Sequence, residues 1–235
     1  MATVRSVSEQ VYEEMVRRII DGSLPPNELL SDRALADQFG VSRTPIREAF
    51  HQLESVGLIK RRSRIGWVVT DFNRRDVVEL IELRAILETA GVRCLINGSD
   101  EERGRVGALF DGFELPFNAE STAEYLRRDH DFHSTIIKAT RNSRIIEVYR
   151  RVNLQIDRVR HFISYRAQSR VEESLEEHRR ITRAIAAKDV GSAIAELNTH
   201  LLNVQYKFVN LLDTVTVSSA YREKEELDSI NERIS

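Results

Sequence analysis

Four polar side chains interrupt apolar helical stripes in the second half of the chain. Asp129 and His133 lie four residues apart, hence on one face of a helix, and that face also carries apolar residues. His178 and His200 lie within the apolar stripes of two later stretches. Each buried polar group needs a partner, and one divalent metal ion bound by three imidazoles and a carboxylate would satisfy all four. Zinc is the first choice, with nickel or manganese as alternatives, and four separately hydrogen-bonded core residues are the competing interpretation.

The elements that must position these residues are predicted to be helices. The chain has 235 residues, of which 41% are apolar and 31% charged, and only ten are glycine and four proline. This composition is typical of a globular, strongly helical protein. Apolar periodicity predicts a C-terminal all-α domain over residues 76–212, with helices at roughly 75–97, 100–115, 120–140, 143–165, 169–187 and 189–212. The charged tail, 213–235, is expected to be a frayed helix or disordered rather than a partner-binding helix.

Two observations bear on location. Cys94 is the single cysteine, which excludes an intrachain disulfide and fits a reducing compartment. No stretch approaches the roughly 18 uncharged apolar residues that a membrane-spanning helix needs. A cytoplasmic protein without a membrane partner is therefore expected.

The first 70 residues follow a different plan. Three short helical stretches are followed by the segments LIK and GWVVT around a polar turn, which predicts a hairpin of two strands. This order is that of a winged helix-turn-helix domain over residues 1–70, joined by a linker at 71–75. The predicted fold is therefore mainly α, with a winged helix-turn-helix followed by a helical bundle.

Positive charge is concentrated in this N-terminal part. Residues 42–64 hold six Lys and Arg against two Glu, a net charge of +4. In VSRTPIREAF, Ser42 or Thr44 can cap a helix, while Arg43 and Arg47 lie on one outward face where the helix dipole favours an anion. A helix entering the major groove of DNA would bring such arginines to phosphates and guanine edges. A solvated basic face is the alternative.

These residues carry a family resemblance. ELLSDRALADQFGVSRTPIREAFHQLESVGLI followed by RIGWVV resembles the DNA-binding domain of GntR-family bacterial transcription regulators. The resemblance implies that Arg33, Ser42, Arg43, Thr44, Arg47 and Gly66 face an operator. Arg64, at the tip of the hairpin, is expected to reach the DNA backbone. Trp67 departs from the smaller residue usual after the wing glycine, and packing beneath the wing would explain it.

The second half resembles the C-terminal ligand-binding (FCD) domain of the FadR subfamily. LRAILE, DHDFH, EHRRI and NTHLL match its landmarks. The resemblance implies that Asp129, His133, His178 and His200 bind a metal ion. It also implies that Arg84, a cation on an apolar stripe, binds the carboxylate of an effector, although a salt bridge to a helix carboxylate would also explain it. Asn153 and Arg158 are further candidates for the effector pocket.

The sequence as a whole predicts a homodimeric, metal-containing transcription regulator, and a repressor is favoured. Its partners would be a pseudo-palindromic double-stranded operator and a small carboxylate or sugar-acid effector. A metal-dependent hydrolase fused to a DNA-binding domain is the alternative, although no buried carboxylate stands out in the sequence as a free general base. A DNA binder without an effector would leave the four inward polar residues unexplained.

Overall fold

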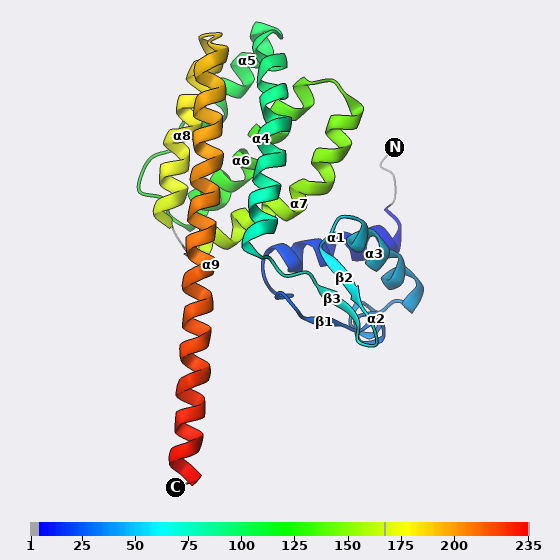
Figure 1. Ribbon diagram of the computed structural model, residues 1–235. Coiled ribbons are helices and arrows are strands. Elements are labelled where there is room, and N and C mark those ends of the chain that lie inside the picture. The colour runs from blue at the N-terminus through cyan, green and yellow to red at the C-terminus, as the bar shows by residue number, and fades with distance from the viewer. Residues whose placement is uncertain (1–4, 167, 235) are drawn as a thin grey trace.

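The computed structural model describes the backbone of residues 5–166 and 168–234, and their side chains except at 164–166, 168 and 215–234. Figure 1 shows a small N-terminal domain beneath a bundle of longer helices. No helix in the described part of the chain is long and apolar enough to cross a membrane.

The N-terminal domain contains three helices and a three-stranded antiparallel sheet. Its elements are α1 (Val7–Ile20), β1 (Leu29–Leu30), α2 (Asp32–Phe39), α3 (Arg43–Ser55), β2 (Ile59–Arg62) and β3 (Gly66–Val69). The predicted hairpin is β2–β3, and β3 pairs on its other edge with β1, so the strand order is β1-β3-β2. Strand β1 was not predicted, because two residues are too few to show a period-2 pattern.

Local sequence explains where these helices begin and end. The Ser31 side chain caps α2 by accepting a hydrogen bond from the Ala34 amide, and Gly40 ends α2 in the left-handed region at φ 67°. Phe50 and Leu53 of α3 are fully buried in the core of the domain. Trp67 packs against the same core, with its ring 5.7 Å from that of Phe50, so the expected packing beneath the wing is confirmed.

The C-terminal domain is all helical in the described residues. Its elements are α4 (Arg74–Ile96), α5 (Asp100–Gly107), the short 3-10 helix η1 (Ala108–Phe110), α6 (Ala119–Ala139), α7 (Ser143–Arg166), α8 (Gln168–Ala186) and α9 (Val190–Ile234). Helix α5 is shorter than predicted: it ends at Gly107, and the chain continues as η1 to Phe110 before Gly112, where φ is 78°. Helix α9 continues through the predicted tail, whose side chains from residue 215 onward lie outside the described part.

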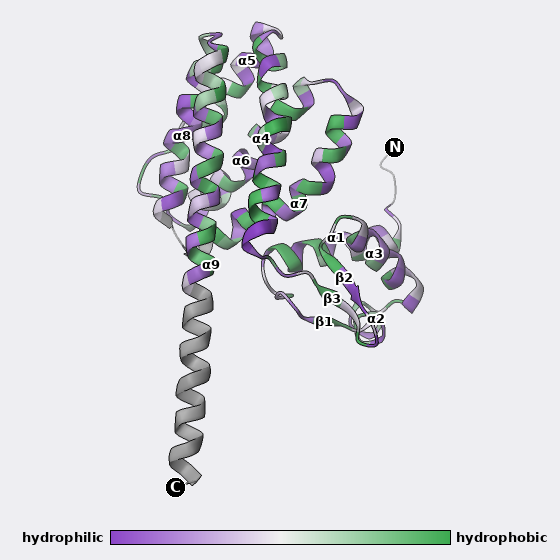
Figure 2. Ribbon diagram, viewed as in Figure 1, coloured by the Kyte–Doolittle hydropathy of each residue, from purple (hydrophilic) through white to green (hydrophobic). Residues whose placement is uncertain are grey.

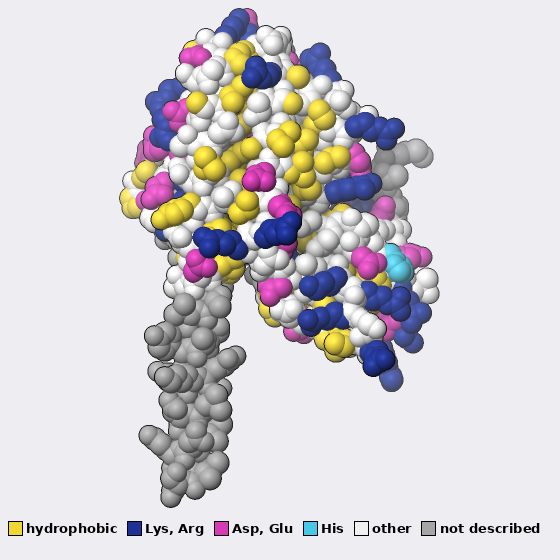
Figure 3. Space-filling model, viewed as in Figure 1, with side chains coloured by type: hydrophobic (Ala, Val, Ile, Leu, Met, Phe, Trp, Pro, Cys, Tyr) yellow, Lys and Arg dark blue, Asp and Glu magenta, His cyan; other side chains and the backbone are white. Residues whose placement is uncertain are grey.

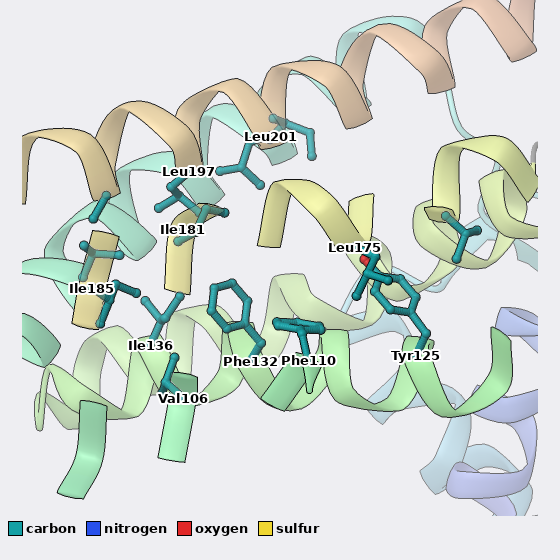
Figure 4. Close-up of a cluster of buried hydrophobic side chains, with 14 of the residues drawn as sticks. Val106, Phe110, Tyr125, Phe132, Ile136, Leu175, Ile181, Ile185, Leu197 and Leu201 are labelled. Carbon is teal, nitrogen blue, oxygen red and sulfur yellow. The ribbon is translucent and has the colours of Figure 1, made fainter. Parts of the chain in front are cut away.

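Helix α4 is central to this bundle, because it packs against α6 and α9, and α8 packs against α9 (Figure 1). Hydrophobic and hydrophilic residues alternate along these helices at helical spacing, as Figure 2 shows. The inward faces form one apolar core, and Figure 4 shows part of it around Phe110, Phe132 and Leu175. Gly91 allows α4 and α6 to touch, since a Cβ there would lie 2.3 Å from the backbone oxygen of Ile136.

Candidate metal centre and nucleic-acid interface

The four polar residues predicted to bind a metal meet inside the C-terminal domain. Helix α6 supplies Asp129 and His133, α8 supplies His178 and α9 supplies His200, and all four are buried. One nitrogen or oxygen atom from each residue lies within 4.8 Å of the corresponding atoms of the other three. His178 Nε2 is 3.1 Å from His133 Nε2 and 3.4 Å from Asp129 Oδ1. Ligands about 2.1 Å from one tetrahedral metal ion lie roughly 3.4 Å apart, so the spacing fits such an ion.

The outer nitrogen of each histidine ring is already engaged. His133 Nδ1 lies 2.6 Å from Glu88 Oε2, and His200 Nδ1 lies 2.7 Å from Glu177 Oε2. His178 Nδ1 lies 2.8 Å from the Tyr125 hydroxyl. A neutral imidazole that donates from Nδ1 to a carboxylate or hydroxyl oxygen keeps a lone pair on Nε2. Burial lowers the pKa of both His133 and His178 well below the usual value, which favours this neutral form.

Facing lone pairs repel each other unless a cation lies between them. The two Nε2 atoms 3.1 Å apart, together with the Asp129 carboxylate, therefore form a donor set suited to a divalent metal ion. Aromatic packing fixes the His178 ring, which stacks on Phe110 with centroids 4.6 Å apart and meets the edge of Phe132. The alternative of four separately satisfied core residues explains the Nδ1 contacts but not the convergence of the inner atoms.

Sequence reasoning missed two buried carboxylates beside the donor set. Glu88 and Glu177 are both buried and hold the outer nitrogens of His133 and His200. Neither is free to act as a general base, because Glu88 also accepts from Arg84 and Glu177 also accepts from Arg170. The sequence indicates these two carboxylates only weakly. Glu88 follows Arg84 by four residues, a spacing that permits a salt bridge on one helix face, and Glu177 is the residue just before His178.

Arg84 lies beside the donor set, as predicted. It is 1% exposed, and its Nε donates to Glu88 Oε1 at 2.5 Å, which is the helix salt bridge considered as the alternative. Its Nη2 is buried without a hydrogen-bond partner in the described structure. Arg84 also lines a cavity of about 40 Å³ with Asp129 and His200, so part of the guanidinium remains available to a ligand beside the salt bridge.

Two further arginines, missed by sequence reasoning, line the same cavity. Arg160 of α7 pairs with Asp129, and Arg170 of α8 pairs with Glu177. The formal charges of the three arginines are offset by Asp129 and the two glutamates, and Asp157 also pairs with Arg160, so a divalent ion would bring the centre to about +1. Ser174 and Tyr125 add hydroxyl groups to the cavity wall.

Asn153 and Arg158 lie elsewhere, and the prediction that they line this cavity is corrected. Asn153 Nδ2 donates to Asp157 Oδ2 at 3.1 Å and borders a cleft toward the N-terminal domain. The Arg158 guanidinium lies over the Phe72 ring, 4.1 Å from its centroid, at the linker. Asn153 lies two turns before Arg160 on the same face of α7, where it contacts His130 instead of the cavity, and Arg158 lies on a different face.

The predicted DNA-binding residues lie on the N-terminal domain. Arg43, Thr44 and Arg47 form the first turns of α3, after Ser42, which begins the helix without a side-chain capping bond. Arg64 stands at the tip of the β2–β3 hairpin with φ 65°, and Gly66 follows with φ 113°. Figure 3 shows Lys and Arg side chains gathered over this domain. The predicted capping bond from the Ser42 side chain is absent, so the first amide hydrogens of α3 make no hydrogen bond to that side chain.

Comparison with known proteins identifies the family of this chain. Residues 7–69 match the profile of the bacterial regulatory proteins of the gntR family, and residues 79–203 match that of the FCD domain. The chain belongs to the GntR family. It is a GntR transcription regulator with an FCD domain, and the relatives it matches are regulators rather than enzymes.

Several relatives of this GntR regulator cover most of its length. It is 31% identical to the transcriptional regulator YdhC of Bacillus subtilis (strain 168), over 81% of this chain and 86% of that protein. It is 28% identical to the gluconate operon transcriptional repressor of the same organism, over 88% and 86%.

Solved structures agree with this assignment. A GntR transcriptional regulator from Rhodococcus sp. RHA1 is 25% identical, covering 88% of this chain and 99% of that one, with a TM-score of 0.73. The Zn²⁺-bound FCD domain of another regulator is 27% identical, covering 61% of this chain and 99% of that one, with a TM-score of 0.52.

Proposed function

We propose that this regulator is a repressor whose affinity for its operator is controlled by a small carboxylate bound at a metal centre in the FCD domain. The observation that carries the proposal is the convergence of one ring nitrogen from each of His133, His178 and His200 with an oxygen of Asp129, while the Nδ1 atoms contact Glu88, Tyr125 and Glu177. We assign zinc first, and the same donor set suits nickel or manganese.

The effector proposal rests on charge. A divalent ion held by Asp129, His133, His178 and His200 supplies positive charge and open ligand positions. The buried guanidiniums of Arg84 and Arg170 have donors without partners among the described residues. A buried excess of positive charge calls for an anion, and a carboxylate can meet a guanidinium with two parallel hydrogen bonds. The cavity of about 40 Å³ has room for little more than water, so side chains must move when a sugar acid enters.

The names of relatives point to a class of effector. One relative is named for the gluconate operon, and another, 25% identical over 85% of this chain, for D-xylose utilization. Gluconate is a sugar acid with one carboxylate and several hydroxyls. Such a molecule matches a cavity with arginines and the hydroxyls of Ser174 and Tyr125, so we place sugar acids first among the candidates.

The DNA proposal assigns the operator contacts to α3 and the wing. Arg43 and Arg47 would meet base edges in the major groove, with Ser42 and Thr44 at the adjoining phosphates. Arg33, Arg64 and Gly66 would contact the backbone on either side. Because one winged helix offers little surface for tight binding, we propose a homodimer on a pseudo-palindromic operator, held together by the FCD domains. Sedimentation of residues 71–235 as a monomer at micromolar concentration would contradict the dimer.

The test joins metal, effector and DNA. The probe is a duplex selected by the protein from a randomised library, titrated with a panel of sugar acids and small carboxylates before and after chelation. We expect an active acid to change duplex affinity at least tenfold, and chelation or His178→Ala to abolish that response while basal binding survives. Glu120→Ala, an exposed change on α6 outside the centre, is the control.

Metal content of the purified protein completes the test. Full carboxylate response in metal-free protein would refute the coupling. Absence of any divalent ion after purification and after addition of zinc, nickel or manganese would refute the centre itself.

A further inference from the structure

The two arginines at the start of α3 are not independent side chains in this structure. Asp32, the first residue of α2, accepts a hydrogen bond from Arg47 Nε at 2.7 Å. The same carboxylate accepts from Arg43 Nη2 at 2.9 Å and 2.8 Å, through Oδ1 and Oδ2. One carboxylate thus joins the N-terminal turns of the two helices of the helix-turn-helix unit.

This arrangement leaves a particular part of each arginine available. The Nε of Arg47 donates a hydrogen bond to Asp32, and no described hydrogen bond involves its Nη1 or Nη2. Arg43 donates to Asp32 through Nη2, and no described hydrogen bond involves its Nη1 or Nε. Both side chains are more than half exposed, whereas that of Asp32 is only 20% exposed. The pair of Arg47 end groups can reach guanine O6 and N7 together, the bidentate contact by which arginine reads a base.

We propose that Asp32 is a specificity-determining residue, which positions Arg43 and Arg47 for base readout and weakens their attraction to phosphates of any sequence. The proposal rests on the proposed role of these arginines at the operator. Two physical effects act together. When a long side chain is fixed before binding, less of its conformational entropy is lost on binding. A negative charge between two cations lowers the local charge that drives sequence-independent binding.

The discriminating variant is Asp32→Asn, which keeps the shape of the side chain and removes its charge. Asp37→Asn is the matched control, because Asp37 lies on α2 as well, is exposed, and changes the net charge by the same amount. Each variant is titrated with two duplexes, one selected by the wild-type protein from a randomised library and one shuffled to the same composition, at several salt concentrations.

We expect Asp32→Asn to bind the shuffled duplex more tightly and with a steeper salt dependence, by up to about one additional phosphate contact. The dissociation constant for the shuffled duplex divided by that for the selected duplex should be at least about fivefold lower in Asp32→Asn than in Asp37→Asn. This is the scale expected when one long side chain loses its fixed position. Asp32→Glu, which restores the charge, should recover most of the ratio. Equal ratios in Asp32→Asn and Asp37→Asn would overturn the proposal.

A double-mutant cycle with Arg47→Ala separates this proposal from the function on which it rests. If Asp32 acts through the arginines, Asp32→Asn should change the ratio much less when Arg47 is already alanine. An effect of equal size in both backgrounds would show that Asp32 touches DNA or the fold directly, and would overturn the positioning role. If Arg47→Ala itself leaves the ratio unchanged, the operator contact of Arg47 fails instead. Urea unfolding of each variant monitors folding separately.

Discussion

At the scale of single residues, the proposed metal centre would depend on groups that do not touch the metal. Glu88 connects Arg84 to His133 by hydrogen bonds of 2.5 and 2.6 Å, and it is fully buried. It therefore fixes both the ring orientation of a proposed ligand and the position of the proposed carboxylate-binding arginine. Residues of this kind tune a metal site as strongly as some direct ligands.

Glu88→Gln should consequently weaken zinc binding about 10- to 100-fold, because the amide is a poorer acceptor for the His133 Nδ1–H and leaves Arg84 uncompensated. Competition with a chromophoric chelator measures the affinity. Glu82→Gln, an exposed change on the same helix, should leave it unaltered. Equal affinities in the two variants would remove Glu88 from the metal site.

At the scale of elements, the contact between α4 and α6 sets the distance between two groups of site residues. Helix α4 holds Arg84 and Glu88, and α6 holds Asp129 and His133. Their closest approach is at Gly91, where there is no room for a Cβ against the backbone of Ile136. Because the obstacle is backbone, it cannot move aside as a flexible side chain would.

Gly91→Ala should destabilise the FCD domain by about 1–3 kcal/mol, the usual cost of overpacking, even though alanine favours helix. It should also weaken metal binding by moving α4 away from α6. Gly104→Ala on α5, where nothing lies within 4 Å of the added carbon, should be neutral or stabilising by up to about 1 kcal/mol. Urea unfolding of both variants checks the sign, and a stabilised Gly91→Ala protein would contradict the close packing.

At the scale of the whole molecule, α7 touches both domains. Gln155 Nε2 donates to the Val56 backbone oxygen at the end of α3, at 3.0 Å, and Leu154 packs against the N-terminal core. The same stretch of α7 reaches the proposed metal centre, because Ile156, Val159 and Arg160 line the cavity beside it. A shift of α7 on effector binding would therefore reach the DNA-binding domain directly.

Gln155→Ala should reduce the effector-induced change in duplex affinity by about 5-fold or more, within the usual range of coupling energies. Basal duplex affinity and zinc affinity should stay within about twofold, as should all three quantities in Arg144→Ala, an exposed change on the same helix. Fluorescence anisotropy with and without the active acid measures the response. An unchanged response in Gln155→Ala would show that the domains communicate by another route.

The sequence alone determined features that depend on local patterns. Apolar periodicity and capping residues defined most helices and the two strands of the hairpin, because these signals act over a few residues. The polar residues on apolar stripes identified Asp129, His133, His178 and His200 as a set, since burial of each demands a partner. Arg84 stood out for the same reason.

Only the tertiary structure decided which groups meet across the chain. Glu88, Glu177, Arg160 and Arg170 join the proposed metal centre through contacts between separate helices, and no local spacing encodes them. Asn153 and Arg158 were placed in the wrong pocket because helical period fixes a face but not the neighbour that the face meets. Asp32 likewise gains its role only when α2 and α3 cross, since eleven residues separate it from Arg43 along the chain.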